Sequence, residues 1–183
     1  SKRELLVVAA GAMTIAAAIV ALVAPHVTLD DAYITFRYAR HLAEGYGLGA
    51  WNHVGDRVEG YSSLLWTLLL AEAARLGVDV RLASKVLGAA AALVVIAALV
   101  RRRDDRPAFL AGLFLAVYMP FVLYAASGME AVAFTSLVTL ALVGPAAWQP
   151  IVAPLLVAMR PEGVLVAGID VLALAWRRER RRW

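Results

Sequence analysis

Residues 82–100 read LASKVLGAAAALVVIAALV, and Arg101, Arg102 and Arg103 follow directly. A helix needs about 20 predominantly apolar residues to cross the hydrocarbon core of a bilayer, and this run has about that length. Lysine and arginine are concentrated at the cytoplasmic ends of such helices. The stretch therefore predicts a membrane-spanning helix whose C-terminal end faces the cytoplasm.

The whole chain has the composition of a membrane protein. Of its 183 residues, 62% are hydrophobic, whereas soluble domains are only about half apolar. Further apolar runs cover residues 5–24, 108–126 and 131–147, and a broken run covers residues 151–176. The sequence has no cysteine, which excludes disulfides, thiolate metal sites and cysteine nucleophiles. We predict a single all-α module over residues 1–183, a polytopic membrane helical bundle.

The first apolar run, residues 5–24, follows Lys2 and Arg3 and could be a signal peptide or a retained anchor. It is longer than the apolar region of a typical signal peptide. In addition, Pro25 directly follows Ala24, the only plausible cleavage residue. We therefore interpret this run as a retained membrane anchor.

Basic residues indicate which side of the membrane each end occupies. Eleven of the 18 Lys and Arg residues lie in three clusters, residues 2–3, 101–106 and 177–182. Each cluster adjoins an apolar run, which argues against a nucleic-acid partner, because such partners need a basic globular face. All three clusters reach the cytoplasm only if residues 61–76 form a helix on the outer surface instead of a span. We therefore predict cytoplasmic N- and C-termini.

Proline interrupts two of the apolar runs. Pro120 predicts a kink, because proline removes a backbone hydrogen-bond donor. The sequence Met159-Arg160-Pro161-Glu162-Gly163 predicts two half-helices that enter the membrane and return. Broken backbone at membrane depth is tolerated only where protein or water surrounds it, so Arg160 and Glu162 are expected to face away from lipid. Such charges indicate function by default, although an ion pair that stabilises the break is an alternative.

Residues 25–60 form the sizeable hydrophilic segment of the chain, and we predict that it is an outer loop. Thr28 or Asp30 is predicted to cap a helix that runs to about His41. If this helix lies on the membrane surface, neighbouring turns form an aromatic and cationic face suited to the headgroup level. The residues of that face are Tyr33, Phe36, Arg37 and Arg40.

Asp30 and Asp31 stand side by side at the start of this helix. Carboxylates there complement the helix dipole, an effect of about 0.3–1 kcal/mol. The pair can also supply a general base beside a membrane-bound substrate, and on that interpretation both are candidate catalytic residues. Histidines of the same loop could join them around a divalent metal, but residues 26, 41 and 53 match no compact ligand motif. We therefore predict no metal site, with a divalent cation as the open alternative.

Four separated blocks of the sequence, taken in order, resemble the bacterial GT-C-fold glycosyltransferases, membrane enzymes that use polyprenyl-phosphate sugars. Within that family the chain is most similar to the group that contains mycobacterial terminal arabinofuranosyltransferases. The matching blocks are Asp30-Asp31-Ala32-Tyr33-Ile34-Thr35-Phe36-Arg37-Tyr38; Gly45-Tyr46-Gly47 with Trp51-Asn52; Val58-Glu59-Gly60-Tyr61-Ser62-Ser63 with Leu65-Trp66; and Ser127-Gly128-Met129-Glu130 with Arg160-Pro161-Glu162-Gly163.

The resemblance implies a mechanism. An acceptor hydroxyl would lose its proton to Asp30, with Asp31 assisting, and attack the anomeric carbon with inversion while polyprenyl phosphate leaves. Cations would stabilise the charge that develops on the phosphate, and the candidates are Arg37, Arg57 and Arg160. The other residues expected to bind the substrate are Tyr38, Glu59, Tyr61, Glu130 and Glu162. For Glu130 the alternative is a carboxylate in the first turn of the next span.

The resemblance also implies a setting. It places the protein in the bacterial inner membrane, in contact with membrane lipid, a polyprenyl-phosphate-linked sugar and a glycan acceptor. It covers the N-terminal part of a family enzyme, which usually continues with more spans. The alternative is a non-catalytic membrane subunit that packs in a larger complex with other membrane subunits. A transporter is supported only by the broken helix.

Overall fold

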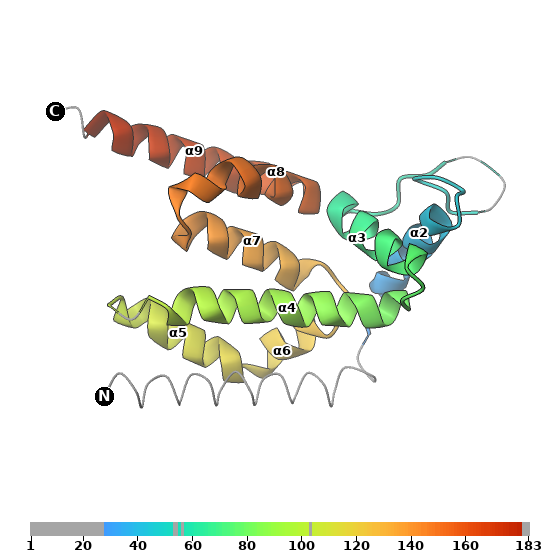
Figure 1. The fold of residues 1–183 in the computed structure, drawn as a ribbon, viewed down its shortest axis with the longest axis horizontal. Coiled ribbons are helices and arrows are strands. Elements are labelled where there is room, and N and C mark those ends of the chain that lie inside the picture. Colours follow the sequence, from blue (N-terminus) through green and yellow to red (C-terminus); the bar gives the residue numbers. More distant parts are fainter. Residues whose placement is uncertain (1–27, 53–54, 56, 103, 181–183) are drawn as a thin grey trace.

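The computed structural model describes residues 28–52, 55, 57–102 and 104–180 (Figure 1). These residues form helices and no strand, which confirms the predicted all-α class. The predicted anchor over residues 5–24 lies outside them. The helices are α2 (Asp30–Ala43), α3 (Leu64–Arg75), α4 (Val80–Val100), α5 (Arg106–Val117), α6 (Met119–Ala125), α7 (Ala131–Val143), the 3₁₀ turn η1 (Ala146–Trp148), α8 (Gln149–Met159) and α9 (Gly163–Arg180).

α4 is the central helix of the bundle and contacts α2, α3, α5, α6 and α7 (Figure 1). The Asp79 carboxylate caps its N-terminus, accepting hydrogen bonds from the N–H groups of Arg81 and Leu82 at 2.9 and 3.1 Å. Within the described residues, α4 is the one helix that is long and apolar enough to cross a membrane by itself. α5 and α6 meet the same test only when they count as one bent span.

The break between α5 and α6 lies where Pro120 predicts a kink. α5 ends at Val117, α6 begins at Met119, and the two helices are bent by 68°. Close packing of small residues holds this region against α4, because a Cβ on Gly88 would collide with the carbonyl of Ala125. The kink that the sequence predicts is therefore present.

The last two helices form the hairpin that the sequence Arg160-Pro161-Glu162 predicts. α8 runs from the α7–η1 turn toward α3, the chain breaks at residues 160–162, and α9 returns beside α8 (Figure 1). Gly163 allows this reversal, because a Cβ there would collide with the carbonyl of Leu156. α7 is shorter than the predicted run 131–147 and ends at Val143.

The bundle has two chemically different ends (Figure 1). One end carries the α4–α5 turn with Arg101, Arg102 and Arg106, together with the C-terminal end of α9. The other end carries α2 and α3, which pack on each other and on the first turns of α4. Between the two ends the outward faces of α5, α8 and α9 expose large apolar side chains, as a lipid-facing surface would. Examples are Leu110, Phe114, Ile151, Leu165 and Leu172.

Two predictions about α2 are wrong in detail. The N-cap residue is Leu29, and neither Thr28 nor Asp30 caps the helix, since no side chain makes a capping hydrogen bond there. Phe36 is not part of an exposed face: only 1% of it is exposed, and it packs in the core with Trp66 and Leu70. Tyr33, Arg37 and Arg40 do remain exposed.

Candidate functional site

The turn Ser127–Glu130 is the point at which the separated sequence blocks meet. The carbonyl of Ser127 accepts a hydrogen bond from the N–H of Leu29, at the start of α2, at 3.0 Å. The carbonyl of Gly128 accepts one from Nε1 of Trp66, on α3, at 3.1 Å. Two segments that are far apart in the sequence, the start of α2 and α3, are therefore joined by hydrogen bonds to one short turn.

Gly128 makes this junction compatible with the packing of α2. Its φ is +89°, a conformation that side chains rarely adopt. A Cβ at this position would lie 2.9 Å from Cζ of Phe36 and 3.0 Å from Cβ of Ala32. The block Ser127-Gly128-Met129-Glu130 thus contains a glycine that both its backbone angle and the contact with α2 require.

Glu130 ties this turn to the break between α8 and α9. Its side chain is 3% exposed, and Oε1 lies 3.5 Å from a guanidinium nitrogen of Arg160. The same guanidinium lies 3.3 Å from Oε1 of Glu162 and faces the ring of Phe134, at 5.9 Å from the ring centroid. The Arg160 side chain is 33% exposed, so part of it reaches solvent.

Asp30 and Asp31 occupy the first turn of α2, directly after the Leu29 N–H that binds Ser127. Both residues are exposed. Within the described part of the chain, neither carboxylate forms an ion pair or a side-chain hydrogen bond, so both oxygen pairs are open to solvent or to a ligand. The predicted acids and the predicted arginine of the break therefore belong to segments that share the Ser127–Glu130 turn.

A second group of predicted residues clusters on α2 and the following loop. Arg37 donates from Nε to the carbonyl of Trp51 at 2.7 Å and from a terminal nitrogen to Oδ1 of Asn52 at 3.1 Å. Its guanidinium carbon also lies 4.4 Å from the Trp51 ring centroid. The ring centroid of Tyr38 lies 5.4 Å from that of Trp51 and 5.2 Å from that of Tyr61. Tyr38 is 3% exposed, so its ring is buried, whereas Trp51 and Tyr61 are partly exposed beside the Arg37 guanidinium.

Glu59 and Arg57 flank this aromatic cluster. Partial burial raises the pKa of Tyr61, and the charge of Glu59 and the neighbouring Tyr38 raise it further. Arg57 donates to the carbonyl of Leu48 at 2.9 Å, and its guanidinium fills the space beside Gly47. Arg57 therefore links its own part of the loop to residues 47 and 48.

His41 has a structural contact in the same region. It is buried, and its Nδ1 lies 2.8 Å from the carbonyl of Ala50. His26 and His53 lie outside the described residues. Within the described part, no three His, Cys, Asp or Glu side chains gather as a metal site would require.

Lys85 is a residue of this region that the sequence analysis did not select. It lies on the second turn of α4, is 9% exposed, and donates from Nζ to the carbonyl of Ala126 at 2.8 Å. This places a buried cation next to the Ser127–Glu130 turn. The available signal was a single lysine inside an otherwise apolar run, since a charge there is costly and indicates function by default.

Comparison of the chain with protein-family models, curated proteins and solved structures found no match.

Proposed function

We propose that this chain is the membrane module of a glycosyltransferase that transfers a sugar from a polyprenyl phosphate to an acceptor outside the cytoplasm. The observation that carries the proposal is the junction at Ser127–Glu130, which binds the start of α2, α3 and Arg160. These segments contain the blocks on which the sequence resemblance rests. A shared junction is what a composite active site requires, because its residues come from distant parts of the chain.

In the proposed reaction, Asp30 takes the proton of the acceptor hydroxyl and Asp31 assists. The hydroxyl oxygen attacks the anomeric carbon, the bond from that carbon to the phosphate oxygen breaks, and the configuration inverts. The open carboxylates of Asp30 and Asp31 support this role, since neither is engaged elsewhere in the described residues.

Arg160 is the best supported candidate for stabilising the leaving phosphate. Glu130 and Glu162 hold its guanidinium in place, while part of the side chain stays exposed. A positioned cation at developing charge is a large catalytic contribution. Arg37 and Arg57 are each bound to loop carbonyls, so we assign Arg37 to the sugar-facing cluster with Trp51, Tyr61 and Glu59, and the buried Tyr38 to the support of this cluster.

The membrane arrangement supports the same proposal. α4 is long and apolar enough to span a bilayer, and the arginines of the α4–α5 turn lie at the end opposite α2 and α3. Positive charge favours the cytoplasmic side, so α2 and the junction are on the outer side of the bacterial inner membrane. Both chain termini are then cytoplasmic.

The test is transfer of a radiolabelled sugar from a polyprenyl phosphate in membranes that contain the full-length protein. Asp30→Asn should lower the rate by about 10²- to 10⁴-fold, the contribution of a general base. Asp104→Asn makes the same chemical change at the opposite end of the bundle and should leave the rate unchanged. Equal rates in wild type and Asp30→Asn would refute the role of Asp30. No transfer by the wild type, with stable co-purification of other membrane proteins, would favour the subunit alternative.

A further inference from the structure

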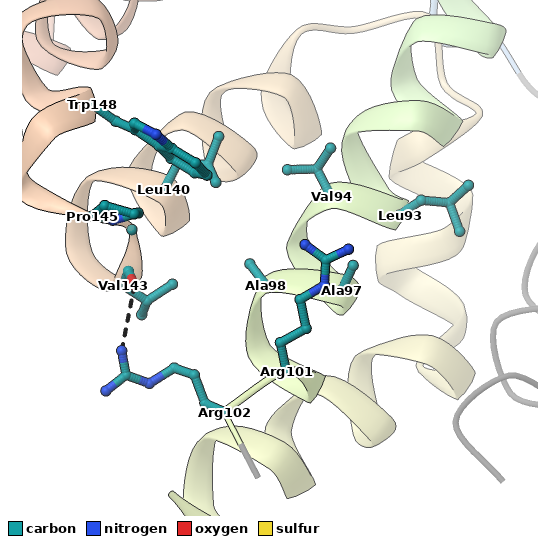
Figure 2. Close-up of a pocket in the computed structure, with 11 residues that line it drawn as sticks. Leu93, Val94, Ala97, Ala98, Arg101, Arg102, Leu140, Val143, Pro145 and Trp148 are labelled. Carbon is teal, nitrogen blue, oxygen red and sulfur yellow. Dashed lines mark hydrogen bonds between the residues drawn. The ribbon is translucent and has the colours of Figure 1, made fainter. Parts of the chain in front are cut away.

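A second binding region lies at the basic end of the bundle, far along α4 from the junction described above. It is a groove of about 620 Å³ between the last turns of α4 and the α7–η1 turn (Figure 2). That volume is within the range of ligand-binding pockets, about 300–1,000 Å³. Its walls are mainly apolar and include Leu93, Val94, Ala97, Leu140, Val143 and Trp148.

Two arginines stand at one edge of this groove. Arg102 donates to the carbonyl of Val143 at 3.4 Å, so its guanidinium reaches from α4 to the end of α7. Its charge is partly balanced by Asp105, at 3.5 Å. The Arg101 side chain runs back along α4 beside Ala97 (Figure 2), and no carboxylate of the described chain pairs with it. The apolar groove is therefore bordered by two arginines, and the single carboxylate of Asp105 can neutralise only one of them.

This pattern of charge and hydrophobicity is complementary to a lipid with a negatively charged headgroup. Basic pockets between membrane helices on the cytoplasmic side bind anionic headgroups, and tryptophan is enriched at the membrane interface. Trp148 is 47% exposed beside the groove, at the same end of the bundle as the arginines. The two arginines and Trp148 thus form a site for a headgroup next to the apolar walls, which can hold an acyl chain.

We propose that the groove binds one anionic membrane phospholipid. Its phosphate lies between Arg101 and Arg102, and an acyl chain lies along the walls formed by α4 and α7. This inference rests on the membrane embedding in the proposed function but not on glycosyl transfer. The site lies at the cytoplasmic end, whereas the sugar donor is assigned to the outer end. The lipid site can therefore fail while the transfer reaction stands, and the reverse also holds.

The test is native mass spectrometry of the full-length protein in detergent, titrated with phosphatidylglycerol or with phosphatidylcholine of the same acyl chains. The wild type should bind one phosphatidylglycerol about thirtyfold more tightly than phosphatidylcholine, or about fivefold for each arginine. The double variant Arg101→Gln/Arg102→Gln should lose this preference. Arg106→Gln removes a charge from the same end but outside the groove and should retain it.

A second variant tests whether the groove itself holds the lipid. Ala98→Trp fills the groove and keeps both arginines, so it should weaken phosphatidylglycerol binding by a similar factor. Circular dichroism confirms that each variant is folded. Equal binding of the two lipids by the wild type would overturn the proposal. So would equal losses in Arg106→Gln and the double variant, unchanged binding in Ala98→Trp, or a lipid-free dimer in which a second copy covers the groove.

Discussion

Arg160 shows how the break between α8 and α9 is held in a defined conformation. The chain cannot continue as a helix through Pro161, and the N–H of Arg160 bonds to the carbonyl of Leu156 as the last turn of α8 ends. Its guanidinium then joins Glu130, on the turn before α7, to Glu162, in the break itself. One side chain therefore fixes the position of the break relative to the junction of the proposed active site.

Glu130 is buried whereas Arg160 is partly exposed, so replacing the two residues should lower the free energy of unfolding by different amounts. Arg160→Gln leaves the Glu130 carboxylate buried without a charge partner, which typically destabilises a protein by about 3–5 kcal/mol. Glu130→Gln leaves a partly exposed guanidinium that still contacts Glu162, so its effect should be smaller. Unfolding by sodium dodecyl sulfate in mixed micelles measures both.

The double variant Arg160→Gln/Glu130→Gln serves as the control for this prediction. It removes both charges and should recover part of the stability that Arg160→Gln loses, because no uncompensated charge remains. Equal losses in the two single variants would contradict the assignment of Glu130 as the buried partner.

The sequence identified several individual residues of the site but not their contacts. Glu130 and Arg160 were selected from local motifs, yet 30 positions separate them, and only the packing of α7 on α8 shows that they pair. Lys85 escaped selection because the apolar run around it satisfied the expectation for a membrane span. Phe36 was misplaced because helical spacing alone does not show which face of a surface helix packs against α3 and α4.

At the scale of the helix, α4 depends on its N-terminal cap. Partial burial alone would raise the pKa of Asp79, but the N–H groups of Leu82 and Arg81 and the charge of Arg81 outweigh it and lower that pKa below its ordinary value. The ionised form is therefore favoured in the folded state. Its stabilising contribution is present above the unfolded-state pKa of about 3.9 and is lost as the pH falls through the lower folded-state value.

Variants of Asp79 test this cap. At neutral pH, Asp79→Ala should destabilise the protein by about 0.5–2 kcal/mol, whereas Asp79→Asn, which also caps helices well, should have a smaller effect. As the pH falls below about 4, the wild type should lose part of its advantage over Asp79→Ala. Asp79→Asn, which cannot titrate, should keep its stability advantage over Asp79→Ala across the same pH range. Unfolding followed by circular dichroism across this pH range measures the differences, and a pH-independent wild-type advantage would contradict the account.

Helix boundaries could be predicted from the sequence where proline or charge marks them. Pro120 and Pro161 locate the two breaks correctly, and Arg101 marks the end of α4. The sequence was less informative where a boundary depends on packing. α7 ends four residues before the predicted run does. The N-cap of α2 is Leu29, whose side chain has no oxygen that could cap the helix, and its N–H binds the carbonyl of Ser127.

At the scale of the whole molecule, both proposals depend on which end of the bundle faces which side of the membrane. The junction with Asp30, Asp31 and Arg160 lies at the end formed by α2 and α3, and the groove with Arg101 and Arg102 lies at the other end (Figures 1 and 2). Glycosyl transfer from a lipid carrier outside the cytoplasm and binding of an anionic phospholipid inside it both require that these ends face opposite sides of one membrane. The positions of the basic clusters at the ends of the apolar runs predict the same membrane orientation from the sequence.

The most direct measurement of that arrangement is the accessibility of single cysteines to a membrane-impermeant maleimide in spheroplasts. The sequence has no cysteine of its own, so Val58→Cys and Asp104→Cys each give one label site at opposite ends of the bundle. Both positions are exposed. The account predicts that Val58→Cys is labelled in intact spheroplasts and that Asp104→Cys is labelled only after lysis. Equal labelling of both before lysis, or labelling of Asp104→Cys alone, would contradict it.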